Sequence, residues 1–113
     1  MRVLAIAVVL FAVSGCGFLL VEGPPRVIPE NAISVRCTES KTLPVLDAVW
    51  AGLNLAGAIL IASDPDGSDI DNPNAAIGFG AVWTIFSGFS AKSGFDKVAD
   101  CREAVDMVAL RNR

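Results

Sequence analysis

The amino-acid sequence predicts an all-α protein in which two apolar helices form a hairpin. Of its 113 residues, 53% are hydrophobic, which is more than an ordinary soluble domain of this size carries. The apolar residues are gathered at 3–13, 43–62 and 75–91, with polar or proline-containing segments between them. Neither of the two later blocks alternates with the period of two that marks a half-buried strand. Composition and patterning therefore favour helices that meet a membrane.

The first block is shorter than a membrane span. Arg2 precedes the 11 apolar residues 3–13, whereas a helix needs about 20 residues to cross a bilayer. A positive start, a short apolar run and small residues at its end are typical of a secretory signal peptide, which we place at residues 1–15. The alternative is an uncleaved anchor helix over residues 3–21, in an inner-membrane protein with several spans. Two glycines would weaken that helix by about 1 kcal/mol each.

The block ends in the motif Val13-Ser14-Gly15-Cys16. This motif resembles the lipobox of bacterial lipoprotein precursors, in which an aliphatic residue and two small residues precede an invariant cysteine. The resemblance covers about the first 17 residues. It implies cleavage before Cys16, which would then carry diacylglycerol and an N-acyl chain such as palmitate. We expect no other cofactor, and more than one acyl chain is what stable anchoring requires.

The resemblance also implies an address in the bacterial cell envelope. The lipid-anchored chain would face the periplasm, and Gly17 replaces the Asp that retains enteric lipoproteins in the inner membrane, which favours the outer membrane. The expected partners are membrane lipid and either further copies of the chain or another envelope protein. Without Arg2 the chain has 8 basic and 12 acidic residues, a net charge of −4. This balance does not indicate nucleic-acid binding.

Two cysteines remain, Cys37 and Cys101, one before and one after the later apolar blocks. In an oxidising periplasm two leftover cysteines are expected to pair. On the chain-entropy model, a bridge closing a loop of about 64 residues stabilises by roughly 4 kcal/mol. Two free thiols are one alternative. A metal site is the other, but the chain has no His and zinc usually takes four Cys or His ligands, so we expect no metal.

The later blocks predict an apolar helical hairpin over residues 43–91. Thr42 is a plausible cap of the first helix, and Pro44 fits its first turn. Both blocks lie near the lower length limit for a membrane span. The loop between them carries four Asp and no Lys or Arg, which conflicts with the positive-inside rule if it faces the cytoplasm. Whether the hairpin spans the membrane or lies shallowly in it therefore stays open.

Small residues recur at every fourth position in both blocks, on one face of each helix. They are Ala48, Gly52 and Ala56 in the first block and Ala76, Gly80, Thr84 and Gly88 in the second. Such grooves let membrane helices approach closely. The pattern resembles the glycine-zipper hairpins of some small bacterial lipoproteins, with Ala and Thr in place of several glycines. The grooves could pack the two helices on each other, join copies of the chain through outer faces, or line a pore.

Two further segments flank the hairpin. Residues 16–42 contain Gly and several Pro, and predict an extended arm between the lipid and the hairpin. Residues 92–113 predict an amphipathic C-terminal helix that begins near Ser93. Its apolar stripe is Val98, Cys101, Val105 and Val108, at helical spacing. The position of Cys101 on this stripe suits a bridge that holds the helix against the segment around Cys37.

The polar residues of the chain point to packing rather than to catalysis. We place Asp47 in the first turn of its helix, where the helix dipole favours a carboxylate, and expect Asn54 to hydrogen-bond to the partner helix. The chain has no His and no Tyr, and its serines have no evident base. We therefore expect a non-catalytic structural or interaction protein of the cell envelope. A self-associating membrane-permeation component is the alternative from another class.

Overall fold

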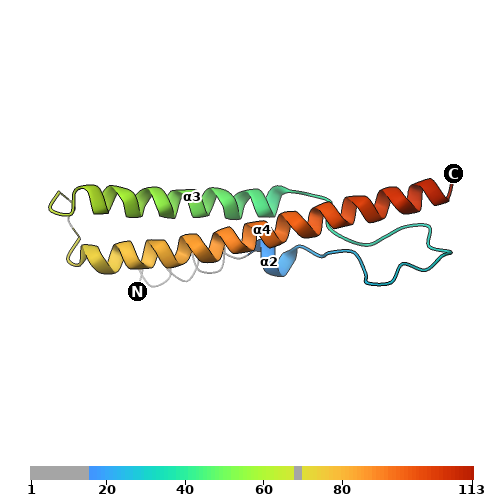
Figure 1. Ribbon diagram of the computed structural model, residues 1–113, viewed down its shortest axis with the longest axis horizontal. Coiled ribbons are helices and arrows are strands. Elements are labelled where there is room, and N and C mark those ends of the chain that lie inside the picture. Colours follow the sequence, from blue (N-terminus) through green and yellow to red (C-terminus); the bar gives the residue numbers. More distant parts are fainter. Residues whose placement is uncertain (1–15, 68–69) are drawn as a thin grey trace, which may run out of the picture.

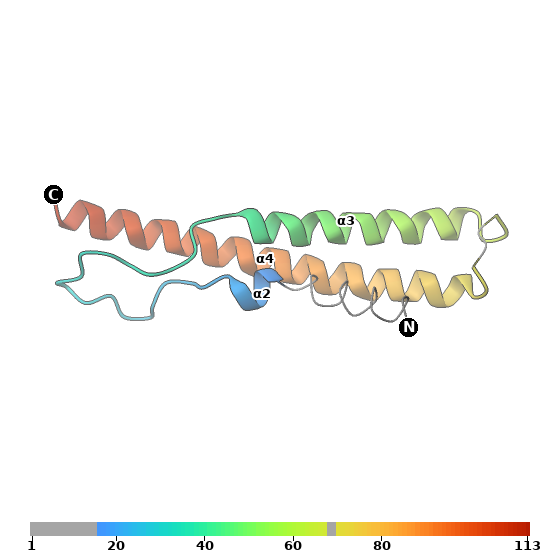
Figure 2. The same cartoon turned by 180° about the vertical axis from the view of Figure 1, so that it is seen from behind.

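The protein is a long helical rod. The computed structural model describes residues 16–67 and 70–113, so the signal peptide predicted at 1–15 lies outside the described residues. Three helices occur there: α2 (Cys16–Leu20), α3 (Thr42–Ser63) and α4 (Pro73–Arg111). Neither described range contains a strand, which confirms the all-α prediction. Helices α3 and α4 lie side by side and antiparallel, and α2 lies against the middle of α4 (Figures 1 and 2).

Helix α3 begins and ends at local signals in the sequence. Thr42 is its first residue rather than its cap, and its amide donates to the Ser40 hydroxyl at 3.3 Å. Pro44 lies in the first turn, where a missing N–H removes no helical hydrogen bond. The helix stops at Ser63, shortly before Pro65, because the residue before a proline is disfavoured in the helical region.

Helix α4 joins the second apolar block and the C-terminal tail into one helix of 39 residues. The Asn72 side chain caps it by accepting from the Ala75 amide at 3.1 Å, and Pro73 occupies its first turn. The predicted boundary at residues 91 and 92 is therefore wrong, and Ser93 lies inside the helix. No proline interrupts residues 74–111, and the buried side of the helix continues in phase across the boundary.

The buried positions of α3 and α4 follow a spacing that alternates between three and four residues. In α3 these positions are Pro44, Asp47, Ala51 and Ala58, with Asn54 half-buried between them. In α4 the series is Gly80, Ser87, Ala91, Gly94, Val98, Cys101 and Val108, with Thr84 and Val105 half-buried in it. Ser90 and Ala104 are also buried, each directly before a position of the series. This is the spacing of coiled-coil seams, since an average of 3.5 residues keeps one side of a helix facing its partner.

Small residues in this seam bring the two backbones close together. The Thr84 hydroxyl donates to the Ala51 carbonyl of the other helix at 3.4 Å. At Gly80, an added Cβ would lie 3.2 Å from the Ala58 Cβ and 3.3 Å from the Asn54 carbonyl oxygen. These distances are shorter than ordinary van der Waals contact, so a side chain at residue 80 would require α3 and α4 to move apart by a few tenths of an ångström.

The outer faces of the hairpin are covered by large apolar side chains. The exposed ones are Val45, Leu46, Val49, Leu53, Leu55, Ile59 and Leu60 on α3, and Phe79, Val82, Ile85, Phe86 and Phe89 on α4. The interface between the helices is made of small and polar residues. Among the described helices, α3 is the one long and apolar enough to cross a membrane, with a mean hydropathy of 1.8. The hairpin thus reverses the usual arrangement of a soluble protein, in which large apolar side chains are buried.

The arm between α2 and α3 is packed along the C-terminal half of α4. It runs out toward the C-terminus and returns (Figure 1). Arg111 donates to the Pro29 and Glu30 carbonyls at 3.2 Å each, and the Asn112 side chain donates to the Ala32 carbonyl at 3.3 Å. The extended arm predicted for residues 16–42 is accordingly a folded loop that begins with the short helix α2.

Candidate membrane-anchor junction

The three helices meet at Ser90, which is 2% exposed. Its hydroxyl donates to the Asp47 carboxylate of α3 at 2.7 Å. The same oxygen accepts from the Phe18 amide of α2 at 3.0 Å. One buried hydroxyl therefore links the segment after Cys16 to both hairpin helices.

Asp47 does not occupy the position that the sequence predicted for it. The first turn of α3 contains no acidic residue, and Asp47 lies further along, on the side that packs against α4. Its side chain is 1% exposed. A carboxylate at this depth needs hydrogen-bond donors, and the Ser90 hydroxyl is one of them. Asp47 therefore belongs to the contact between helices rather than to the end of one helix.

Lys97 holds the other side of α2. Its ammonium group donates to the Phe18 carbonyl at 2.9 Å and lies 5.1 Å from the centre of the Phe18 ring. That distance is within the range of a cation–π interaction. Val21, the residue after α2, is buried as well. The chain that follows Cys16 is thus fixed at the level of residues 90–97 of α4.

The surface changes character at this same level. On one side, residues 43–62 and 73–91 contain a single charged side chain, the buried Asp47. On the other side charged residues are frequent, and Lys92 forms an exposed ion pair with Asp96 at 2.7 Å. The junction between α2 and the hairpin is therefore also the border between an apolar half and a charged half of the rod.

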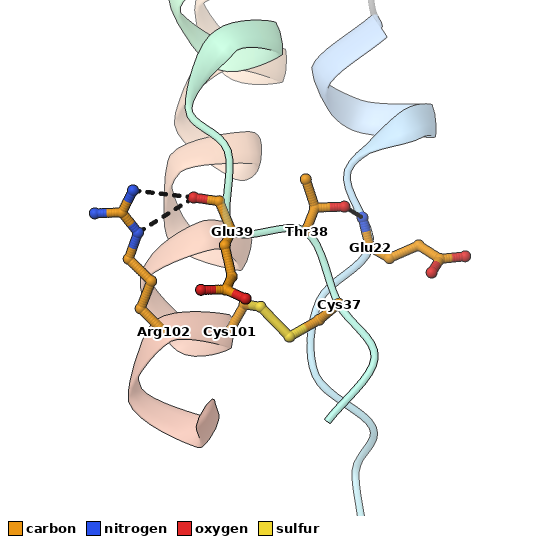
Figure 3. The surroundings of a disulfide bond; sticks show 6 residues. All are labelled: Glu22, Cys37, Thr38, Glu39, Cys101 and Arg102. Carbon is orange, nitrogen blue, oxygen red and sulfur yellow. Dashed lines mark hydrogen bonds between the residues drawn. A yellow bond between two sulfur atoms is a disulfide. The ribbon is translucent and has the colours of Figure 1, made fainter. Parts of the chain in front are cut away.

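A disulfide joins Cys37 of the arm to Cys101 of α4 in the charged half, as the sequence predicted (Figure 3). The two Cα atoms are 5.8 Å apart, and Cys101 is fully buried. The next residue, Arg102, donates twice to the Glu39 carbonyl, at 3.0 and 3.2 Å. The bridge and these hydrogen bonds fasten the segment of the arm that leads back to α3 onto α4.

A second set of hydrogen bonds joins the two passes of the arm to each other. The Thr38 amide donates to the Glu22 carbonyl at 3.0 Å. The Glu22 amide donates to the Thr38 hydroxyl at 3.1 Å (Figure 3). The bridge beside Thr38 therefore holds both passes of the arm: the one that contains Thr38 directly, and the one that contains Glu22 through these hydrogen bonds.

The small residues of the two predicted grooves are placed differently. Gly80 and Thr84 lie in the contact between α3 and α4. Ala76 and Gly88 are half-buried. Ala48, Gly52 and Ala56 are exposed, and a Cβ on Gly52 would meet nothing within 4 Å.

The spacing explains this separation. A constant step of four residues turns by about 40° more than a full circle each time, so a stripe of that period drifts away from a straight partner. Gly80 and Thr84 coincide with the seam, whereas the α3 stripe lies beside it. The sequence signal that identifies the residues between α3 and α4 is a spacing that alternates between three and four residues.

The polar and aromatic residues inside the hairpin also depart from the prediction in one respect. The Asn54 side chain donates to the Trp50 carbonyl of its own helix at 2.8 Å rather than to α4. Thr84 makes the cross-helix contact instead. Trp83 stacks on the rings of Phe79 and Phe86, with centroids 5.6 and 5.8 Å apart. These rings extend the apolar surface of α4.

The site combines an exposed apolar surface on the hairpin with a fixed segment after Cys16. In the described ranges, no group of three His, Cys, Asp or Glu side chains is placed to hold a metal ion. In comparisons with known proteins, no family model, no curated protein and no solved structure matches this chain. The function is therefore argued from the geometry of the hairpin and of the junction.

Proposed function

We propose that this chain is a small lipid-anchored protein of the bacterial cell envelope, with a structural or interaction role and no catalytic one, whose hairpin is embedded in the membrane. One observation carries the proposal: the hairpin exposes large aliphatic and aromatic side chains and buries small and polar ones between its helices. In lipid, helices associate through close packing of small residues and through hydrogen bonds rather than through the hydrophobic effect. The hairpin therefore has the distribution of side chains expected of helices that are surrounded by lipid.

The dimensions of the hairpin agree with this solvent. Helix α3 has 22 residues and is about 33 Å long, against about 30 Å of hydrocarbon in a typical bilayer. The apolar part of α4, residues 73–91, is about 28 Å long by the same rise per residue. A charged side chain in a membrane helix almost always faces the interior of the bundle. Asp47 meets this requirement through its contact with Ser90.

The lipid anchor and the disulfide favour the same side for the charged half. Helix α2 begins at Cys16 and is held at the border of the apolar half, so lipid on Cys16 would enter the membrane beside the hairpin. A stable disulfide is typical of an oxidising compartment such as the periplasm. In this proposal the arm and the end of α4 face the periplasm, and the acidic loop lies at the far end. Gly17 favours the outer membrane.

The intact mass of the membrane-extracted protein, with and without reductant and alkylation, tests the proposal. We expect a chain that begins at Cys16, carries added acyl mass and shows two alkylated thiols only after reduction. A chain that begins at Met1 without acyl mass would support the alternative of an uncleaved inner-membrane protein with several spans. Three thiols that react without reductant would contradict both the anchor and the oxidised pair.

A second candidate is a membrane-permeation component that associates with copies of itself. The exposed stripe of Ala48, Gly52 and Ala56 favours it, because small residues on a free helix face permit close approach of another helix. Chemical crosslinking in membranes separates the candidates. A ladder of homo-oligomers would support self-association, and a single product with one other envelope protein would support the interaction role.

A further inference from the structure

A small apolar notch lies between α2 and α4, on the apolar side of the junction. It is lined by Phe18, Phe86, Phe89 and Ser90, and its volume is about 140 Å³. Three of these four residues are phenylalanines that are exposed, from 49% for Phe18 to 67% for Phe89. The hydroxyl of Ser90 is engaged by Asp47 and by the Phe18 amide. The notch therefore presents aromatic surface and suits an aliphatic ligand.

The notch adjoins the predicted lipidation site. Phe18 follows Cys16 by two residues, within the single turn of α2. This turn cannot move freely, because Ser90 binds the Phe18 amide and Lys97 binds the Phe18 carbonyl. Phe86 and Phe89 lie toward the apolar half of α4, and Lys97 lies toward the charged half. A chain that starts at Cys16 and enters the membrane thus begins next to the notch.

We propose that one acyl chain of the lipid on Cys16 lies in this notch, against the rings of Phe86 and Phe89. The inference rests on the proposed lipidation and adds to it a defined binding site for the acyl chain. The anchor and the hairpin then enter the membrane as one packed unit, and the lipid fills the surface that α2 leaves open on α4. A free phospholipid and the side chain of a second copy are the competing occupants.

Photocrosslinking of the full-length protein in native membranes tests the inference. Cells are supplied with a fatty acid that carries a diazirine in mid-chain, so that the reactive group enters the anchor of Cys16. The intact mass is measured first. After irradiation, the protein is digested and the crosslinked peptides are mapped by mass spectrometry. We expect the Cys16 peptide joined to residues 86–89 of the same molecule.

Matched variants make the result specific to the notch. Phe89→Ala removes one wall, and we expect the yield of the crosslink between Cys16 and α4 to fall several-fold. Phe79→Ala removes the same side chain from an exposed position of the same helix outside the notch, and we expect no change in the yield. Both variants must keep the Cys37–Cys101 bridge by mass, which shows that the fold is intact.

Each other outcome overturns the inference. Crosslinks spread along the outward residues Val82 and Ile85, or insensitive to Phe89→Ala, would show that the acyl chain has no fixed place. A phospholipid adduct at residues 86–89, or a link between two copies, would assign the notch to a competing occupant. An unacylated Cys16 would overturn the proposed function together with the inference, and the first mass measurement distinguishes this case from the others.

Discussion

At the residue scale, Ser90 and Gly80 show how little side-chain volume holds the hairpin together. Ser90 joins three helices through one oxygen atom. At Gly80 the two helices are so close that an added Cβ would lie 3.2 Å from the Ala58 Cβ of the other helix. In water such contacts would give a weak core, because the area removed from solvent is small. In lipid the same contacts are the main source of helix association.

Replacing Ser90 tests the junction directly. We expect Ser90→Ala to lower the free energy of unfolding by about 1–3 kcal/mol, because a buried carboxylate and a backbone amide each lose a hydrogen-bond partner. Thermal unfolding in detergent micelles, followed by far-UV circular dichroism, measures the loss. Ser93→Ala is the control, since Ser93 is half-buried on the same helix and takes no part in the junction. Equal effects of the two variants would contradict the assigned role of Ser90.

Gly80 and Gly78 form a matched pair for the crossing of α3 and α4. We expect Gly80→Val to lower the free energy of unfolding by about 1–3 kcal/mol, because the valine side chain adds atoms to a contact that is already filled. Gly78→Val carries the same change in helix propensity, but a Cβ at Gly78 meets nothing within 4 Å, so we expect a neutral or slightly stabilising result. Urea titration of both variants in micelles gives the comparison. A destabilised Gly78→Val with an unaffected Gly80→Val would mean that the helices do not cross there.

At the element scale, the seam explains what the sequence could predict and what it could not. The long apolar blocks and the absence of a period of two were sufficient to predict two helices that begin near Pro44 and near residue 75. The composition changes from apolar to charged at Lys92, and the prediction therefore placed a boundary there. The helix continues because the backbone can stay helical and the residues that face α3 and the arm keep the same spacing. These positions run unbroken from Gly80 to Val108 with steps of three and four.

The junction illustrates the other limit of prediction. The pairing of Cys37 with Cys101 followed from two observations: two cysteines remain beside the predicted lipidation site, and the expected compartment is oxidising. The contact between Asp47 and Ser90 could not be predicted, because it joins residues 43 positions apart and depends on the register of two antiparallel helices. A residue sequence contains no local signal for such a register when most facing side chains are small.

A proline at the predicted boundary tests the continuity of α4. If a separate helix began at residue 93, Ser93→Pro would be tolerated in its first turn. In a continuous helix the proline removes the hydrogen bond to residue 89 and clashes with its carbonyl, which costs about 3 kcal/mol or more. We expect the large loss, measured as faster hydrogen exchange of residues 86–96. Asn74→Pro, in the true first turn, is the control and should have little effect; a harmless Ser93→Pro would restore the two-helix description.

At the scale of the whole molecule, the rod consists of an apolar hairpin at one end and a charged, disulfide-linked half at the other. The two halves share α4, which is continuous through the border. The arm lies on the charged half of this helix and α2 lies at the border (Figure 2). In the proposed topology, a periplasmic partner would therefore meet the arm and the end of α4, at a fixed height above the membrane.

Loss of the bridge should loosen the charged half and leave the hairpin in place. Cys37 and Cys101 are 64 residues apart in the sequence. For a loop of this length, the chain-entropy model predicts that the bridge stabilises the folded state by roughly 4 kcal/mol. We expect Cys37→Ser to accelerate trypsin cleavage after Arg26 and Arg36 in the arm, while residues 43–91 stay protected in membranes. The oxidised parent protein is the control. Unchanged cleavage of the arm would show that the hydrogen bonds of Arg102 and Arg111 suffice to hold it.

The placement of the acidic loop decides whether the hairpin spans the membrane. Helix α3 is long and apolar enough to cross a membrane, and the uncharged residues 73–91 of α4 cover a similar length beside it, so we expect the loop and the arm on opposite faces. Two variants report on this, Asp66→Cys in the exposed loop and Ser34→Cys in the exposed arm, each treated with a polymer-linked maleimide too large to cross the outer membrane.

For a hairpin spanning the outer membrane, Asp66→Cys reacts in intact cells, and Ser34→Cys reacts only after osmotic shock opens the periplasm. In the inner membrane, Asp66→Cys stays unreactive until detergent is added, while Ser34→Cys again reacts after the shock. Reaction of both variants together after the shock would mean that the hairpin lies in one leaflet. In that case any part of the apolar faces of α3 and α4 outside the hydrocarbon would be covered by another copy of the chain or by a partner.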